Sequence, residues 1–115
     1  MHIPQSLLQG AICPITAGLS IFGIGAAGYA TILYTKKIRA SSFGAVTALI
    51  FILQMLNFPI QGGTSGHLLG GVLASALLGT PLGVLALTLV VTIQALVFSD
   101  GGLTVLGANV LNMAI

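Results

Sequence analysis

The chain has 115 residues, of which 57% are hydrophobic and only 3% are charged, and its mean hydropathy is +1.16. A soluble domain carries about 25% charged residues because water has to wet its surface, so this composition excludes an ordinary soluble domain and indicates an integral membrane protein. The formal charge is only +2, and all three cations lie between Lys36 and Arg39. That is too little and too local for nucleic-acid binding.

The N-terminus shows no signal peptide, because it lacks a basic n-region and its first apolar stretch is too long for an h-region. We expect Met1 to be the mature N-terminus, since the bulky second residue, His2, hinders removal of an initiator methionine. The single cysteine, Cys13, excludes an internal disulfide framework and a CxxC zinc site. It is followed by Pro14, a pattern that predicts the start of a helix, with the thiol used for packing.

Apolar segments run in series along the chain, separated by short connections. A membrane helix needs about 20 predominantly apolar residues, and lipid forces each segment to satisfy its own backbone hydrogen bonds. We therefore predict an all-α, polytopic membrane bundle of about five transmembrane segments, in one domain over residues 1–115. The predicted spans are 11–34, 43–60, 67–79, 82–98 and 103–115.

The basic loop fixes an expected orientation. The positive-inside rule places residues 36–42 in the cytoplasm. Counting spans from that loop then places the N-terminus and the loops 60–66 and 99–102 outside. His2 and His67, which are the only two histidines, are therefore predicted to lie on the same outer face.

Small residues recur at a spacing of three or four positions in the first and third predicted spans. Such ridges allow membrane helices to approach closely. For the third span we expect packing within the bundle, whereas for the first span packing and docking of another membrane subunit are both open. The ridges are Gly23–Ala27–Gly28 and Gly66–Gly70–Ala74.

The first two residues can chelate a metal ion. The Met1 amine, the His2 backbone nitrogen and the His2 imidazole close two fused rings on one ion, with loss of the amide proton. One further donor completes a four-nitrogen plane, and His67 is the available candidate. Planar nitrogen donors suit Ni(II) and Cu(II) and can hold Co(II), whereas a structural zinc site is tetrahedral and usually contains thiolates.

Each histidine also has an ordinary interpretation. His2 can belong to a frayed, solvated terminus, and His67 can cap a helix or lie among lipid headgroups. Ionisable residues within membrane segments are nevertheless functional by default, so the paired-ligand interpretation stands beside these alternatives.

Side-chain amides gather in the outer halves of the predicted spans, and Gln54 lies one turn deeper. At that shared depth they can orient the histidines by hydrogen bonding. The alternative is ordinary interhelical hydrogen bonding, worth about 0.6 kcal/mol each on average. The outer amides are Asn57, Gln94 and Asn109.

The remaining polar features do not predict catalysis. Asp100, the only carboxylate, lies in a Ser-Asp-Gly-Gly sequence that a turn or a helix cap explains better than a ligand role. The sequence contains no nucleophile–base pair, phosphate loop or Walker motif. We therefore expect that the chain is not an enzyme and cannot hydrolyse ATP itself.

Three separated blocks resemble a known family: the MHIP start, LQMLNFPIQGGTSGHLLGG, and IQALVFSDGGLTVLGANVLNMA. They are similar to the CbiM/NikM family, the substrate-binding membrane subunits (S components) of energy-coupling-factor ABC transporters for cobalt and nickel. The resemblance covers nearly the whole chain and is weakest in the first predicted span.

The resemblance implies that Met1, His2 and His67 hold the ion, with Thr64 and Ser65 of the TSGH block among the residues that orient them. It implies no resident cofactor, Co(2+) or Ni(2+) as transported ligand, and a link to cobalamin biosynthesis. It also implies a place in the lipid of the cell membrane, with the N-terminus outside. The implied partners are a transmembrane coupling subunit, two cytoplasmic ATPase subunits and often a small accessory membrane subunit.

Two departures from the family pattern are visible. The family usually has an acidic residue after MHIP, whereas this chain has Gln5. Family members also continue through further membrane helices, whereas this chain ends at Ile115, so it can be a fragment of a longer protein. The competing class is a small structural or assembly subunit of a membrane complex. The sequence leaves the choice between cobalt and nickel open.

Overall fold

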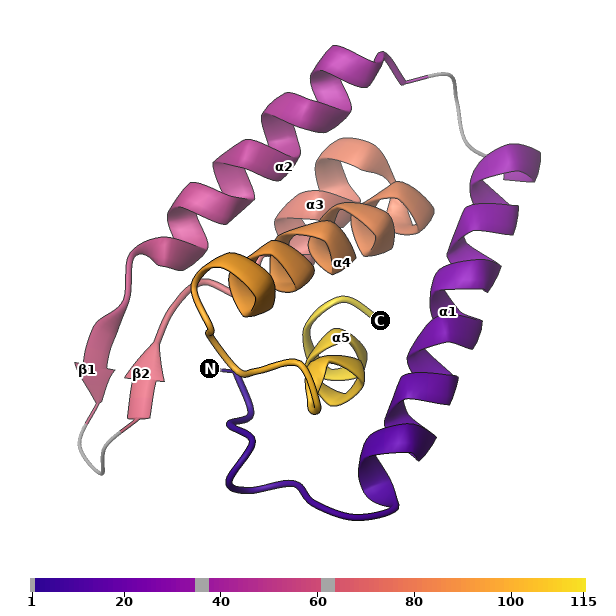
Figure 1. Ribbon diagram of the computed structural model, residues 1–115. Helices are drawn as coiled ribbons and strands as arrows, with labels where there is room; N and C mark the ends of the chain where they lie inside the picture. Colours follow the sequence, from indigo (N-terminus) through magenta and orange to yellow (C-terminus); the bar gives the residue numbers. More distant parts are fainter. Residues whose placement is uncertain (1, 35–37, 61–63) are drawn as a thin grey trace.

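The computed structural model describes residues 2–34, 38–60 and 64–115. Five helices and one short hairpin follow each other in chain order (Figure 1). The elements are α1 (Ile12–Tyr34), α2 (Ala40–Met55), β1 (Phe58–Ile60), β2 (Thr64–Gly66), α3 (Gly71–Leu78), α4 (Thr80–Val97) and α5 (Leu106–Met113).

Helix α4 forms the centre of the bundle, because it contacts α1, α2, α3 and α5. It is joined to α3 by a tight turn in which Gly79 has φ +80° and Pro81 occupies the first turn of the new helix, where proline is tolerated. Gly83 then lets α4 approach α3, since a Cβ at this position would lie 3.1 Å from the backbone nitrogen of Ser75. The core around α4 consists of Ile50, Ala74, Leu87, Val90, Val91, Val110, Met113 and Ala114.

Helix α1 stands at the side of the bundle and packs on α4 and α5 (Figure 1). Its outer face is apolar and open, with the Phe22 side chain 77% exposed. Its threonine and serine hydroxyl groups are satisfied within the helix, as in the hydrogen bonds from Thr16 to the Ile12 carbonyl (2.8 Å) and from Thr31 to the Ala27 carbonyl (2.9 Å). Such internal bonding suits a helix whose surroundings offer no water.

The helical architecture is confirmed apart from the short β1–β2 hairpin, but five full-length spans are not. Among the described residues, two helices are long and apolar enough to cross a membrane, Ile12–Leu33 and Thr80–Val97, and α2 is a shorter apolar helix of 16 residues. Helices α3 and α5 have eight residues each. At 1.5 Å per residue they reach about 12 Å, well short of the roughly 30 Å hydrocarbon layer.

The second predicted span needs one correction at its end. It was expected to run to Ile60, but α2 ends at Met55, and β1 pairs antiparallel with β2 in the register Pro59↔Ser65. Proline supplies the reason: Pro59 cannot donate a helical hydrogen bond, and it biases the preceding residue, Phe58, towards an extended conformation.

Glycine shortens the third predicted span and also shapes the loop that precedes the fifth. Gly70 has φ +82°, so α3 begins only at residue 71, and Gly79 ends it. Before α5, Gly101 and Gly102 have φ values of +84° and +94° and keep the chain out of a helix. Left-handed backbone of this kind favours glycine.

The two small-residue ridges differ in how they pack. In the third predicted span, Ala74 is fully buried and a Cβ at Gly70 would lie 2.8 Å from the Ile50 side chain, which confirms packing within the bundle. In the first span, Gly23 faces Ile115, whereas a Cβ at Gly28 would meet no atom within 4 Å. The ridge on α1 therefore turns only partly inward.

The close approach of α1 and α5 predicts a specific sensitivity. A Cβ at Gly107 would lie 2.5 Å from the Ala17 Cα atom, so Gly107→Ala should lower the free energy of unfolding by about 1–3 kcal/mol through overpacking. Gly18→Ala is the matched control, because a Cβ at Gly18 meets nothing within 4 Å and alanine favours a helix. Thermal unfolding followed by circular dichroism in detergent measures both. Equal unfolding midpoints for the two variants would contradict this packing.

Candidate metal centre

The two histidines meet at one end of the bundle. The N-terminal segment runs back to the loop that joins α4 and α5, beside the hairpin (Figure 1). There the His2 ring lies 5.4 Å from the His67 ring, centroid to centroid, at an interplanar angle of 38°. The His2 side chain is 1% exposed and His67 is 8% exposed. The burial of the His2 side chain argues against a frayed, solvated terminus.

His67 has a defined tautomer. It follows β2 and precedes α3, whose N-cap position is Gly70, so His67 does not cap that helix. Its Nδ1 lies 2.9 Å from the carbonyl oxygen of Leu68. Because a carbonyl only accepts, Nδ1 donates in this contact, so the neutral imidazole has its lone pair on Nε2. That Nε2 is buried and has no hydrogen-bond partner among the described residues.

The His2 ring lies against the only carboxylate of the chain. Nδ1 of His2 is 3.1 Å from Oδ2 of Asp100, which is within ion-pair distance. The contact does not have the geometry of a hydrogen bond, and neither ring nitrogen of His2 has a hydrogen-bond partner among the described residues. Burial lowers the pKa of the His2 imidazole, and Asp100 opposes this shift only in part. His2 is therefore neutral near pH 7, the form in which imidazole binds metals.

The Asn109 side chain holds the N-terminal segment in place. Its Oδ1 accepts a hydrogen bond from the Ile3 backbone nitrogen (2.6 Å), and its Nδ2 donates to the Ile3 carbonyl (3.2 Å). Asn109 is buried on α5, so this two-point contact fixes the backbone directly after His2. These hydrogen bonds of the Asn109 side chain therefore go to the Ile3 backbone and not to a histidine ring.

Two buried glutamines frame the centre. Gln54 of α2 donates a hydrogen bond to the Leu69 carbonyl (2.6 Å) and so holds the segment that carries His67. Gln94 of α4 lies beside the His2 ring. The Oε1 atoms of both glutamines are buried without a partner among the described residues. Orphaned polar atoms are costly in an interior, and the Gln94 side chain is the one of these two that interacts with a histidine ring.

The loop after α4 closes over His2 without room for another side chain. A Cβ at Gly101 would lie 3.0 Å from the Cβ of His2 and 2.5 Å from Nδ2 of Asn109. Gly102 is similarly close to Gln5. Gly101 is therefore favoured by space and by its positive φ, whereas Gly102 is favoured by its positive φ, because the exposed Gln5 side chain could move aside.

Some predicted site residues lie away from the two histidines, and others lie outside the part of the chain that the structure describes. Met1 lies outside the described residues, as do the side chains of Thr64 and Ser65. Asn57 is exposed beyond the end of α2. Within residues 2–34, 38–60 and 64–115, no group of three or more His, Cys, Asp or Glu side chains is arranged to hold a metal.

Asp100 is the residue that sequence reasoning missed. A turn or a cap had seemed sufficient for it, yet its carboxylate contacts His2. The signal was present, because the 99–102 loop had been placed on the same face as both histidines and contains the only anion of the chain.

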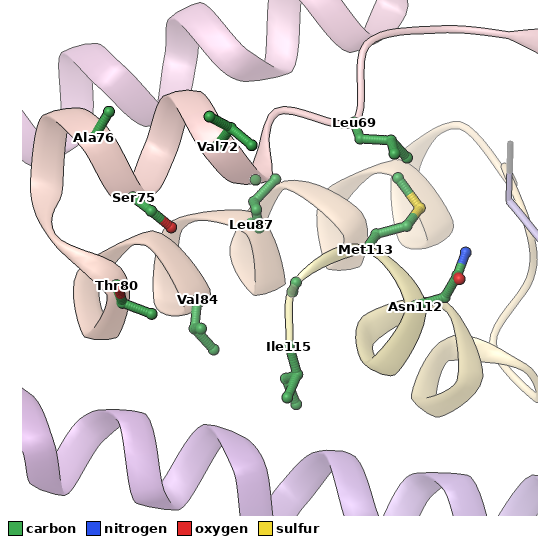
Figure 2. Close-up of a pocket in the computed structure, with 12 residues that line it drawn as sticks. Leu69, Val72, Ser75, Ala76, Thr80, Val84, Leu87, Asn112, Met113 and Ile115 are labelled. Atoms are coloured by element: carbon green, nitrogen blue, oxygen red, sulfur yellow. The ribbon is translucent and has the colours of Figure 1, made fainter.

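The structure also has a cavity whose lining includes neither His2 nor His67. It has a volume of about 720 Å³ and opens between α3, α4 and the end of α5. Figure 2 shows Ser75, Thr80 and Val84 along one side and Asn112, Met113 and Ile115 along the other. Its lining is mostly apolar and contains no titratable side chain, so we do not assign it to the metal centre.

Comparison with known proteins decides the family. Residues 2–115 match the family model for CbiM, described as the cobalt uptake substrate-specific transmembrane region. The chain belongs to the CbiM family. The predicted resemblance to CbiM/NikM proteins is confirmed. The family consists of membrane components for cobalt and nickel transport, so it is a transporter family and not an enzyme family.

Its relatives carry transport names. A protein of Archaeoglobus fulgidus, provisionally named fused nickel transport protein NikMN, is 53% identical over 116 residues, which cover 100% of this chain and 38% of that protein. The cobalt transport protein CbiM of Lachnoclostridium phytofermentans is 38% identical over 119 residues, covering 100% of this chain and 47% of that protein.

A solved structure shares the fold. The crystal structure of a truncated transition metal transporter matches with a TM-score of 0.89 and 35% identity, and the match covers 100% of this chain and 54% of that chain. The CbiM-family chain thus spans between 38% and 54% of the length of these three relatives.

The Asn109 contact predicts how the N-terminal segment responds to mutation. Asn109→Ala removes two hydrogen bonds, each worth about 1 kcal/mol, so the Ile3 amide should exchange with deuterium at least about tenfold faster. Asn112→Ala is the control, because Asn112 is exposed on the same helix. Hydrogen exchange read by mass spectrometry of the N-terminal peptide measures this. Unchanged protection in Asn109→Ala would contradict the proposed tether.

Proposed function

We propose that this chain is the metal-binding part of the substrate-binding membrane component of an energy-coupling-factor ABC transporter for cobalt or nickel ions. The observation that carries the proposal is the buried His2–His67 pair, 5.4 Å apart, with unpartnered ring nitrogens. The family relationship supports the transport role.

The donor atoms follow from bonding geometry. His2 can chelate through its backbone nitrogen and Nδ1, because Nδ1, Cγ, Cβ, Cα, the backbone nitrogen and the metal close a six-membered ring. Nε2 points away from its own backbone and cannot close this ring. The Met1 amine closes a five-membered ring on the other side of the same backbone nitrogen. Nε2 of His67, whose lone pair is free, supplies the fourth nitrogen.

This donor set selects a class of ion. Four nitrogens in a plane suit Ni(II) and are accepted by Co(II). The transported ion is the cargo, so the site has to release it as well as bind it. Opening of the N-terminal segment exposes two of the three chelating residues at once, which provides a route for release.

The transporter assembly belongs to the same proposal. We place the chain in the cell membrane with its N-terminus outside, on the grounds of the cationic 36–42 loop. Its partners are a transmembrane coupling subunit, two cytoplasmic ATPase subunits and a small accessory membrane subunit. The ATPases supply the energy, since the sequence has no nucleotide-binding motif. A purely structural subunit would leave the buried, unpartnered imidazole nitrogens without an explanation.

Metal titration tests this function. With Ni(II) followed by isothermal titration calorimetry in detergent, His67→Ala should bind at least about 100-fold more weakly than the wild type, because a direct ligand is lost. Asn112→Ala, which removes an exposed amide on α5, should bind like the wild type. Equal affinities for His67→Ala and the wild type would favour the structural class.

The free amine gives an independent test. A protein that keeps an uncleaved N-terminal extension, or a formyl group on Met1, should lose binding because the amine is a ligand. The same protein cleaved to leave Met1 at its start should recover it. Tight binding by the extended protein would refute the chelate, whereas loss followed by recovery supports it.

A further inference from the structure

Asp100 occupies an unusual position for a turn residue. It is the only acidic side chain of the chain, and it is 37% exposed while the His2 side chain beside it is 1% exposed. The neighbouring residues Ser99 and Gly101 line an open cleft of about 570 Å³ between the N-terminal segment and the α4–α5 loop. Asp100 does not line that cleft itself, but its partly exposed carboxylate lies beside the buried His2 imidazole.

The backbone holds Asp100 in that position. At the end of α4, the backbone nitrogens of Phe98 and Asp100 both donate to the Gln94 carbonyl, each at 3.1 Å. Ser99 between them has φ +54°, in the left-handed region that non-glycine residues rarely occupy. Gly101 continues the turn at φ +84°. The turn directs the carboxylate towards the His2 ring, to 3.1 Å from Nδ1.

Nδ1 is also the atom that the chelate uses. The metal lies about 2 Å from such a nitrogen, so a bound ion would be only a few ångströms from the Asp100 carboxylate. This contact is not a hydrogen bond, so it does not serve to fix the ring. We propose, on the basis of the proposed function, that Asp100 is a positioning residue for the ion: it supplies the negative charge that balances the metal held by Met1, His2 and His67.

Charge balance is the physical reason. A dication bound to one deprotonated amide, one amine and two neutral imidazoles leaves a net charge of +1, while the amide proton departs to water. An unbalanced charge in a buried site is costly. One adjacent carboxylate neutralises the site without entering the nitrogen plane. Arg39, which precedes α2, cannot balance the charge of the ion because it is itself positive.

The same carboxylate affects capture of the ion. A partly exposed anionic group beside a binding site raises the local concentration of cations and increases the association rate. Removal of the charge should therefore slow association as well as weaken binding. A structural role for Asp100 would predict neither effect when asparagine replaces it, because asparagine serves in turns in the same way as aspartate.

The experiment is a Ni(II) titration of the purified full chain in detergent, comparing the wild type with Asp100→Asn, Asp100→Glu and His67→Ala. Asp100→Asn should bind about 10- to 100-fold more weakly, the usual range for a residue next to the ligands. Its visible absorption at saturation and its unfolding midpoint should match the wild type, because the nitrogen donors are unchanged. Asp100→Glu should recover most of the affinity. Asp100→Ser serves as a second neutral variant if Asp100→Asn does not fold.

Two results would overturn the inference. In the first, Asp100→Asn binds within about threefold of the wild type, below the effect expected of a residue next to the ligands, while His67→Ala loses binding. In the second, the saturated spectrum of Asp100→Asn changes, which would make Asp100 a direct ligand. If His67→Ala itself binds like the wild type, the proposed function fails instead, so the two failures are distinguishable.

Discussion

The N-terminal backbone has to be held against the bundle, because residue 2 can reach residue 67 only when the chain folds back on itself. Asn109 provides that contact through two hydrogen bonds to Ile3. These bonds contribute about 1 kcal/mol each, whereas ordering the backbone of one residue costs about 1–2 kcal/mol. The tether therefore offsets the ordering of only one or two residues, and burial of His2 has to supply the rest. A segment balanced so closely can close on an ion and open again.

Irregular backbone gathers where the centre is built. The hairpin, the segment 67–70 and the loop 98–105 all interrupt helices that would otherwise have been longer. In a membrane protein such backbone is tolerated where protein covers it, and here Gln54 satisfies the Leu69 carbonyl while Gly101 packs against His2. The short α3 and α5 result from this arrangement. These helices are short because the loops beside the two imidazoles occupy part of the sequence that longer helices would have used.

Part of this structure could be predicted from the sequence. Hydropathy predicted the helical bundle and the first and fourth spans, and the cation pattern placed His2 and His67 on one face, where their rings meet. The ends of the other helices could not be predicted from hydropathy, because Pro59 and the positive-φ residue Gly70 stop them without changing the apolar character. Asp100 was missed because a turn explained it locally, and its contact with His2 spans 98 positions of sequence.

The most direct measurement of the central claim is nickel K-edge X-ray absorption of the protein loaded with one equivalent of Ni(II). The account predicts a planar ion with four nitrogen donors, two of them imidazoles, as Ni(II) prefers in such sites. Multiple scattering from two rings and the edge feature of a planar complex would support it. An octahedral ion surrounded mainly by oxygen, or a single imidazole in the scattering pattern, would contradict the claim that His2 and His67 hold the metal together.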